Sequence, residues 1–127
     1  MLTGLLALPA RYWLGLSVVA LAVLTVLSLL PLPAPPGVAG SDKLLHLVAW
    51  GLAVIPAALA LGWRVLPVIG VFLAWSIAIE FAQPFAGRFF EVADMIANVV
   101  GLSLGAGLGI ALRWLTGLRD GTHVHEA

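Results

Sequence analysis

Four long apolar segments set the main constraint on how this chain can fold. They run near residues 12–30, 43–62, 65–83 and 94–115, and each approaches the roughly 20 residues that a helix needs to cross a bilayer. The composition agrees, since 62% of the 127 residues are hydrophobic and 9% are charged. We therefore predict an all-α membrane protein, a bundle of four transmembrane helices forming a single domain over residues 1–127.

The composition also excludes some functions. The chain has no cysteine, which excludes thiol catalysis and thiolate metal sites. Its formal net charge of zero argues against a nucleic acid partner. The first apolar segment ends before Val38-Ala39-Gly40, which resembles a cleavage site, but the segment is long for a signal peptide, and we expect it to remain as a span. His123 and His125 could suggest metal binding, although a short polar tail explains them more simply.

Basic residues predict the orientation in the membrane. One side of the predicted spans carries four of them, Arg11, Arg64, Arg113 and Arg119, whereas Lys43 and Arg88 lie on the other side among acidic residues. Lysine and arginine near the ends of spans are enriched on the cytoplasmic side. We therefore expect both termini in the cytoplasm.

Polar residues gather at the outer ends of three predicted helices. They are Asp42, Lys43 and His46, then Glu80 and Gln83 with the nearby Arg88, and finally Asp94 and Asn98. A charged residue at the bilayer centre costs roughly 2.5–3.5 kcal/mol, so such residues persist where they pair or line a cavity. Helix positions three and four apart share a face. We expect these eight side chains to form one outward-facing ligand-binding cluster.

Simpler roles remain open for the same residues. The two aspartates begin helices and could cap free amides, and the two cations could anchor the membrane interface. Inside the helices, His46, Glu80 and Asn98 could serve as interhelical hydrogen-bond partners.

An enzymatic role is also open. His46 and Glu80 are the candidate catalytic residues, as a base and the carboxylate that orients it. No Ser, Cys or Thr forms a nucleophile motif beside them, and Ser76 could serve only if the helices pack suitably. We therefore favour a role without catalysis.

Ion binding and headgroup binding are the remaining alternatives. Asp42, His46, Glu80 and Asp94 could ligate a divalent cation, but no known spacing such as H-E-x-x-H occurs, so we expect no metal and no cofactor. Lys43 and Arg88 could instead hold a phosphate or carboxylate headgroup. The ionisable residues stop at the outer third of the predicted spans, which disfavours an ion pathway.

Three glycines predict how the fourth segment packs. Gly101, Gly105 and Gly109 are spaced by four, a pattern that allows membrane helices to approach closely. The partner could be another helix of the chain or a second copy, so a homo-oligomer through this glycine face is an open alternative.

In this order and at these spacings, Asp42-Lys43-x-x-His46, Glu80-x-x-Gln83, Arg88 and Asp94-x-x-x-Asn98 with Gly101 and Gly105 resemble the VanZ-like family of small bacterial membrane proteins. The resemblance covers residues 41–109. Trp50 stands where the family commonly has tyrosine, and Leu47 where phenylalanine is frequent, which puts in doubt any role assigned to a phenolic hydroxyl.

The resemblance implies a multi-pass protein of the bacterial cytoplasmic (inner) membrane. The family is named for an accessory factor of resistance to teicoplanin, whose lipid tail seats it at the outer leaflet. From the resemblance and the cluster together we expect binding of a membrane lipid or a lipid-linked cell-wall component, and an effect on lipoglycopeptide susceptibility is one extension. The alternative is an intramembrane transferase or hydrolase acting on a lipid-linked envelope substrate.

Overall fold

The described part of the chain is built from helices. The computed structural model describes residues 8–31 and 40–117, so Val38, Ala39, Arg119, His123 and His125 lie outside it. Its elements are α2 (Ala10–Leu29), α3 (Ser41–Leu61), the 3₁₀ turn η1 (Gly62–Val65), α4 (Leu66–Ala82), the 3₁₀ turn η2 (Gln83–Ala86) and α5 (Val92–Leu115). No strand occurs in these two ranges. The all-α prediction is confirmed, and the α-helices follow the four apolar segments closely.

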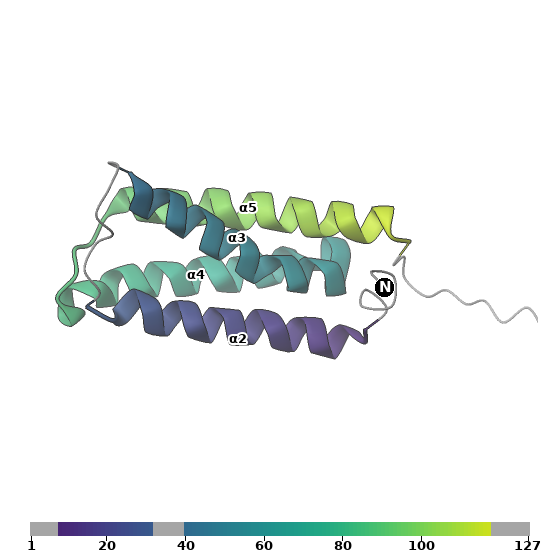
Figure 1. The fold of residues 1–127 in the computed structure, drawn as a ribbon, viewed down its shortest axis with the longest axis horizontal. Helices are drawn as coiled ribbons and strands as arrows, with labels where there is room; N and C mark the ends of the chain where they lie inside the picture. The colour runs from purple at the N-terminus through teal and green to yellow at the C-terminus, as the bar shows by residue number, and fades with distance from the viewer. Residues whose placement is uncertain (1–7, 32–39, 118–127) are drawn as a thin grey trace, which may run out of the picture.

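Three helical stretches are long and apolar enough to cross a membrane, by length and composition. They are Ala10–Leu29, Ser41–Ala86 and Val92–Leu115. The second stretch contains both α3 and α4: α3 leads to the η1 turn, and α4 runs back from it in the opposite direction (Figure 1). These helices fit a membrane protein.

The helix termini gather at two opposite ends of the molecule (Figure 1). The start of α2, η1 and the end of α5 lie at one end, and the start of α3, η2 and the start of α5 lie at the other (Figure 1). At the first end, Gly62 has a φ of 57°, which ends α3 and suits glycine. Arg113 of α5 donates hydrogen bonds to the carbonyl oxygens of Leu59 (2.7 Å) and Ala60 (3.1 Å) there. A cation on these last carbonyls stabilises the C-terminus of α3.

Close contact between α3 and α5 depends on the three glycines. A Cβ atom at Gly101 would lie 2.2 Å from the carbonyl oxygen of Leu47, and one at Gly105 would lie 2.2 Å from that of Gly51. A Cβ at Gly109 would also collide with α3. The glycine face is thus covered by α3 of the same chain, and a homo-oligomer would need another surface.

Pro56 interrupts the hydrogen bonding of α3, and Ser17 of α2 bridges the gap. Proline has no N–H and its ring crowds the carbonyl one turn earlier. The Ser17 hydroxyl donates to the carbonyl oxygen of Ala53 (2.7 Å) and accepts a hydrogen bond from the N–H of Ala57 (2.9 Å). In a regular α-helix those two backbone groups bond each other. The buried hydroxyl of Ser17 therefore both satisfies α3 and ties α2 to it.

The two faces of α5 test the glycine packing. Gly105→Ala should lower the free energy of unfolding by about 1–3 kcal/mol, because its methyl group would push the α3 backbone away. Gly107→Ala should be neutral or stabilising by up to about 1 kcal/mol, because a Cβ there meets nothing within 4 Å. Thermal unfolding in detergent, followed by circular dichroism, compares the two variants. Equal melting temperatures would contradict the packing.

The Ser17 bridge gives a second prediction. Ser17→Ala should destabilise the protein by about 1–3 kcal/mol, because it leaves two buried backbone groups without partners. Ser103→Ala is the matched control, since the exposed Ser103 hydroxyl donates to the Val99 carbonyl oxygen of its own helix. The same unfolding measurement applies, and similar losses in both variants would count against the bridge.

Candidate functional site

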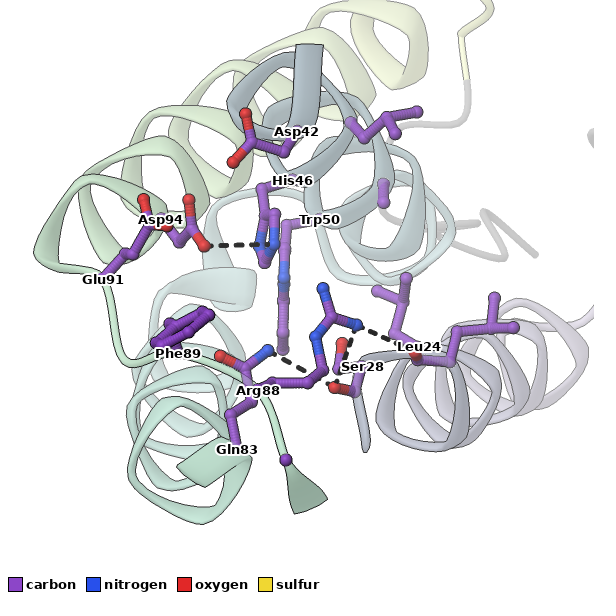
Figure 2. A pocket seen from close by; sticks show the side chains of 14 residues that line it. Leu24, Ser28, Asp42, His46, Trp50, Gln83, Arg88, Phe89, Glu91 and Asp94 are labelled. Carbon is purple, nitrogen blue, oxygen red and sulfur yellow. Dashed lines mark hydrogen bonds and ion pairs between the residues drawn. The ribbon is translucent and has the colours of Figure 1, made fainter. Parts of the chain in front are cut away.

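A pocket of about 550 Å³ lies at the end of the molecule where α3 and α5 begin. Its walls come from α2, α3, α5 and the segment after α4 (Figure 2). The polar lining consists of Ser28, Asp42, His46, Gln83, Arg88, Glu91 and Asp94, and the apolar lining includes Leu24, Leu27, Leu45, Ala49, Trp50 and Phe89. The structure thus brings five of the eight predicted ligand-binding residues to one cavity.

Lys43 is held by carboxylates rather than directed at the pocket. Its ammonium lies 2.5 Å from Asp42 Oδ2 and 3.4 Å from Asp94 Oδ1, and it also pairs with Glu91. It is absent from the pocket lining. Lys43 therefore ties the start of α3 to the start of α5, which differs from the headgroup contact that we expected of it.

Neither aspartate is the capping residue of its helix. The residues that precede α3 and α5 are Gly40 and Glu91, and neither helix has a side-chain hydrogen bond at its cap. Asp42 and Asp94 instead lie in the first helical turns, where their charge meets the positive end of the dipole. The Asp42 carboxylate pairs with Lys43, and the Asp94 carboxylate lies near both Lys43 and His46.

His46 joins α3 to α5 through both ring nitrogens. Its Nδ1 lies 3.0 Å from Asn98 Oδ1, and its Nε2 lies 3.6 Å from Asp94 Oδ2. If Nδ1 carries the proton that Asn98 accepts, Nε2 of a neutral ring presents its lone pair to Asp94. A proton or a cation between them is then needed to make that contact attractive.

Glu80 is the least satisfied group of the site. Its side chain is 0% exposed, and neither carboxylate oxygen has a hydrogen-bond partner among the described residues. The backbone N–H of Glu91 is near, but it does not meet hydrogen-bond geometry. A buried carboxylate without partners is costly in either protonation state.

Gln83 is partly unsatisfied as well. Its Nε2 donates to the Ser28 carbonyl oxygen at 3.4 Å, whereas its Oε1 has no partner within the part of the chain that the structure describes. The side chain is buried, with 1% exposed. Gln83 therefore joins the end of α4 to the end of α2 and retains a free acceptor.

Arg88 reaches across the pocket to α2. Its Nη1 donates to the carbonyl oxygens of Leu27 (3.4 Å) and Ser28 (3.3 Å), and Figure 2 shows Arg88 beside Ser28. Within residues 8–31 and 40–117 it makes no ion pair with a carboxylate, and its side chain lines the cavity. The remaining guanidinium N–H groups are available to a ligand.

Two trios of side chains have the composition of a metal site. In the first, a ring nitrogen of His46 and one carboxylate oxygen each of Glu80 and Asp94 lie within 4.8 Å of one another. In the second, oxygens of Asp42, Glu91 and Asp94 do so. The second trio holds the Lys43 ammonium, which already neutralises it in part.

Ser76 does not join His46. Its hydroxyl donates to the Leu73 carbonyl oxygen of its own helix at 2.9 Å and is absent from the pocket lining. The polar partners of His46 in the described chain are Asn98 and Asp94. Ser76 therefore does not supply a nucleophile to the candidate catalytic pair.

Glu91 is a site residue that we had not predicted. It pairs with Lys43 and lines the pocket. Its position three residues before Asp94, next to a helix start, is a signal in the sequence that could have found it.

Comparison with known proteins gives no assignment, because no family model, curated protein or solved structure matches the chain.

Proposed function

We propose that the chain crosses the membrane four times, with both termini in the cytoplasm and the pocket facing outward. A straight helix over the 46 residues of Ser41–Ala86 would be about 70 Å long, more than twice the hydrocarbon thickness of a bilayer. The turn between α3 and α4 supports two crossings instead. Arg11, Arg64 and Arg113 belong to the end opposite the pocket, and the preference for basic residues in the cytoplasm supports that orientation.

Cysteine labelling tests the orientation, because the chain has no cysteine of its own. Phe85→Cys and Trp63→Cys replace side chains that are 94% and 70% exposed, near opposite ends. In intact cells, an impermeant thiol reagent should label the Phe85→Cys variant and spare the Trp63→Cys variant. Permeabilised cells, in which both should react, provide the control. The reverse pattern would overturn the orientation.

We further propose that the pocket binds an amphiphile at the outer leaflet. The observation that carries this proposal is a cavity with a leucine-rich wall beside a polar wall, at one end of apolar helices. A lipid tail would lie against Leu24, Leu27 and Leu45, and the headgroup would meet the polar residues. Such division of a site into apolar walls and a few polar groups is typical of small-molecule pockets.

The charges favour a headgroup that is not simply anionic. Arg88 offers charge-assisted hydrogen bonds to a phosphate or carboxylate. On the other side, Asp42, Glu91 and Asp94 line the pocket and suit hydrogen-bond donors or an amine. A lipid-linked cell-wall component that carries both a phosphate and a peptide or amine has this combination of groups.

The resemblance to the VanZ-like family supports the same proposal. Five of the residues that carry the resemblance, Asp42, His46, Gln83, Arg88 and Asp94, line one pocket. We accordingly propose the bacterial cytoplasmic membrane as the location. Lipid-anchored glycopeptides such as teicoplanin then belong to the ligands worth testing. A transferase or hydrolase that uses His46 and Glu80 stays the alternative, without Ser76 as its nucleophile, because the Ser76 hydroxyl is bonded to Leu73.

Arg88 is the residue whose loss should weaken headgroup binding most. Arg88→Gln removes a charged donor worth about 1.5–3 kcal/mol, so the affinity for a polyprenyl diphosphate should fall roughly 10- to 150-fold. Native mass spectrometry or tryptophan fluorescence on protein in detergent measures the change. Phosphatidylglycerol and phosphatidylethanolamine serve as comparison lipids for a phosphate alone and a phosphate with an amine.

Arg64→Gln is the matched control, because Arg64 is exposed and belongs to the opposite end of the molecule. It should leave the affinity unchanged. Melting temperatures of both variants show whether the contact of Arg88 with α2 matters for folding. Equal retention of all three lipids by folded Arg88→Gln and wild-type protein would overturn the headgroup assignment.

A further inference from the structure

We propose that His46, Glu80 and Asp94 form a binding site for one divalent transition-metal cation, with Zn²⁺ as the best-fitting example. The spacing of these residues along the chain matches no common metal motif, because they come from three different helices, α3, α4 and α5. The inference therefore depends on how the helices bring the side chains together.

The ligand atoms are close to metal-binding geometry. The three candidate atoms lie within 4.8 Å of one another, and His46 Nε2 lies 3.6 Å from Asp94 Oδ2. Two ligands of a tetrahedral zinc ion, each about 2.0–2.2 Å from the metal, lie about 3.3–3.6 Å apart. Small side-chain movements would bring all three atoms to this distance.

Glu80 is the independent indication of a ligand. Its carboxylate is fully buried, and the described residues offer neither of its oxygens a hydrogen bond. Nearly all buried polar groups in proteins have partners, and the exceptions call for a reason such as an ion or a water. A cation between Glu80, His46 and Asp94 would satisfy both carboxylates together.

Asn98 holds His46 in the orientation that a metal needs. Metal-binding histidines usually donate their second ring N–H to an oxygen, which selects the tautomer and the ring direction. His46 Nδ1 has this contact with Asn98 Oδ1 at 3.0 Å. The lone pair of Nε2 is then directed toward Asp94, where the cation would lie.

The charge of this end matches one divalent cation. Four carboxylates, Asp42, Glu80, Glu91 and Asp94, face two fixed cations, Lys43 and Arg88. With all four carboxylates ionised, as coordination of a metal requires of Glu80 and Asp94, the excess is two negative charges, and a divalent ion would neutralise it. Buried charges in a membrane protein persist when they are compensated in this way.

The ligand types indicate the class of metal. An imidazole with two carboxylates suits zinc or manganese, whereas magnesium and calcium prefer sites made of oxygen alone. Three protein ligands leave a coordination position open. Because His46 and Asp94 line the pocket, that position would face it and could take water or, on the amphiphile proposal, an oxygen of the headgroup.

Zinc titration of the full-length protein in detergent tests the site. Every protein should lack a polyhistidine tag and carry His123→Ala and His125→Ala, because that tail could bind zinc itself. Isothermal titration calorimetry with ZnCl₂ should show one ion per chain. Asn98→Ala should weaken binding roughly 10- to 100-fold, and Glu80→Gln should weaken it further, because a ligand is lost.

Glu91→Gln is the matched control, since it makes the same change in the trio that holds Lys43. It should weaken zinc binding much less than Glu80→Gln does, because Glu91 contributes negative charge but no ligand atom to the proposed site. Equal loss in Glu91→Gln and Glu80→Gln would mean diffuse binding to the acidic mouth and would overturn the site. Equal affinity in all variants, or no binding, would overturn it too.

Thermal unfolding separates a metal ligand from a structural carboxylate. Zinc should raise the melting temperature of the wild-type and Glu91→Gln proteins but not of Glu80→Gln. Without metal, Glu80→Gln should melt at or above the wild-type temperature, because the substitution removes a buried carboxyl group that has no hydrogen-bond partner among the described residues. A much lower value would overturn the site. Arg88 is not a ligand, so these results stand apart from those of the lipid assay.

Discussion

The close approach of α3 and α5 determines the rest of the molecule. Gly101 and Gly105 let the two backbones touch near Leu47 and Gly51. Because the helices are this close, the short side chains of Asp94 and Asn98 reach His46 across the interface. Larger residues on α5 would separate the helices and pull these partners apart. The packing that gives the fold its stability therefore also assembles the polar site.

A second constraint is that backbone groups inside a membrane have no water to bond with. Side chains from neighbouring helices supply the missing partners in this chain. Ser17 bridges the interruption at Pro56, and Arg113 covers the last carbonyls of α3. Arg88 does the same for the end of α2. Several hydrophilic side chains thus form hydrogen bonds with the backbone of neighbouring helices. Only their remaining donors and acceptors are available to a ligand.

Periodicity along each helix could be read from the sequence, but the pairing between helices could not. Apolar length predicted where the helices run, and the spacing of glycines indicated a packing face. Helices that are apolar on all sides give little information on how they rotate against one another. For that reason Ser17, the partners of Lys43 and the contact of Arg88 with α2 emerged only from the structure. The grouping of polar residues at one end followed from their positions, since all lie near the same helix ends.

Stability alone does not account for Glu80. An apolar side chain of similar volume would fill the same space without the cost of a buried carboxylate. His46 already has Asn98 as a hydrogen-bond partner, and Lys43 already draws the starts of α3 and α5 together. Ionised Glu80 would add negative charge to an end that is already rich in carboxylates, and the described residues offer its oxygens no donor. Burying the Glu80 carboxylate is costly and gains no contact within the described chain. A bound ligand would account for it, and a cation that neutralises the site is the simplest such ligand.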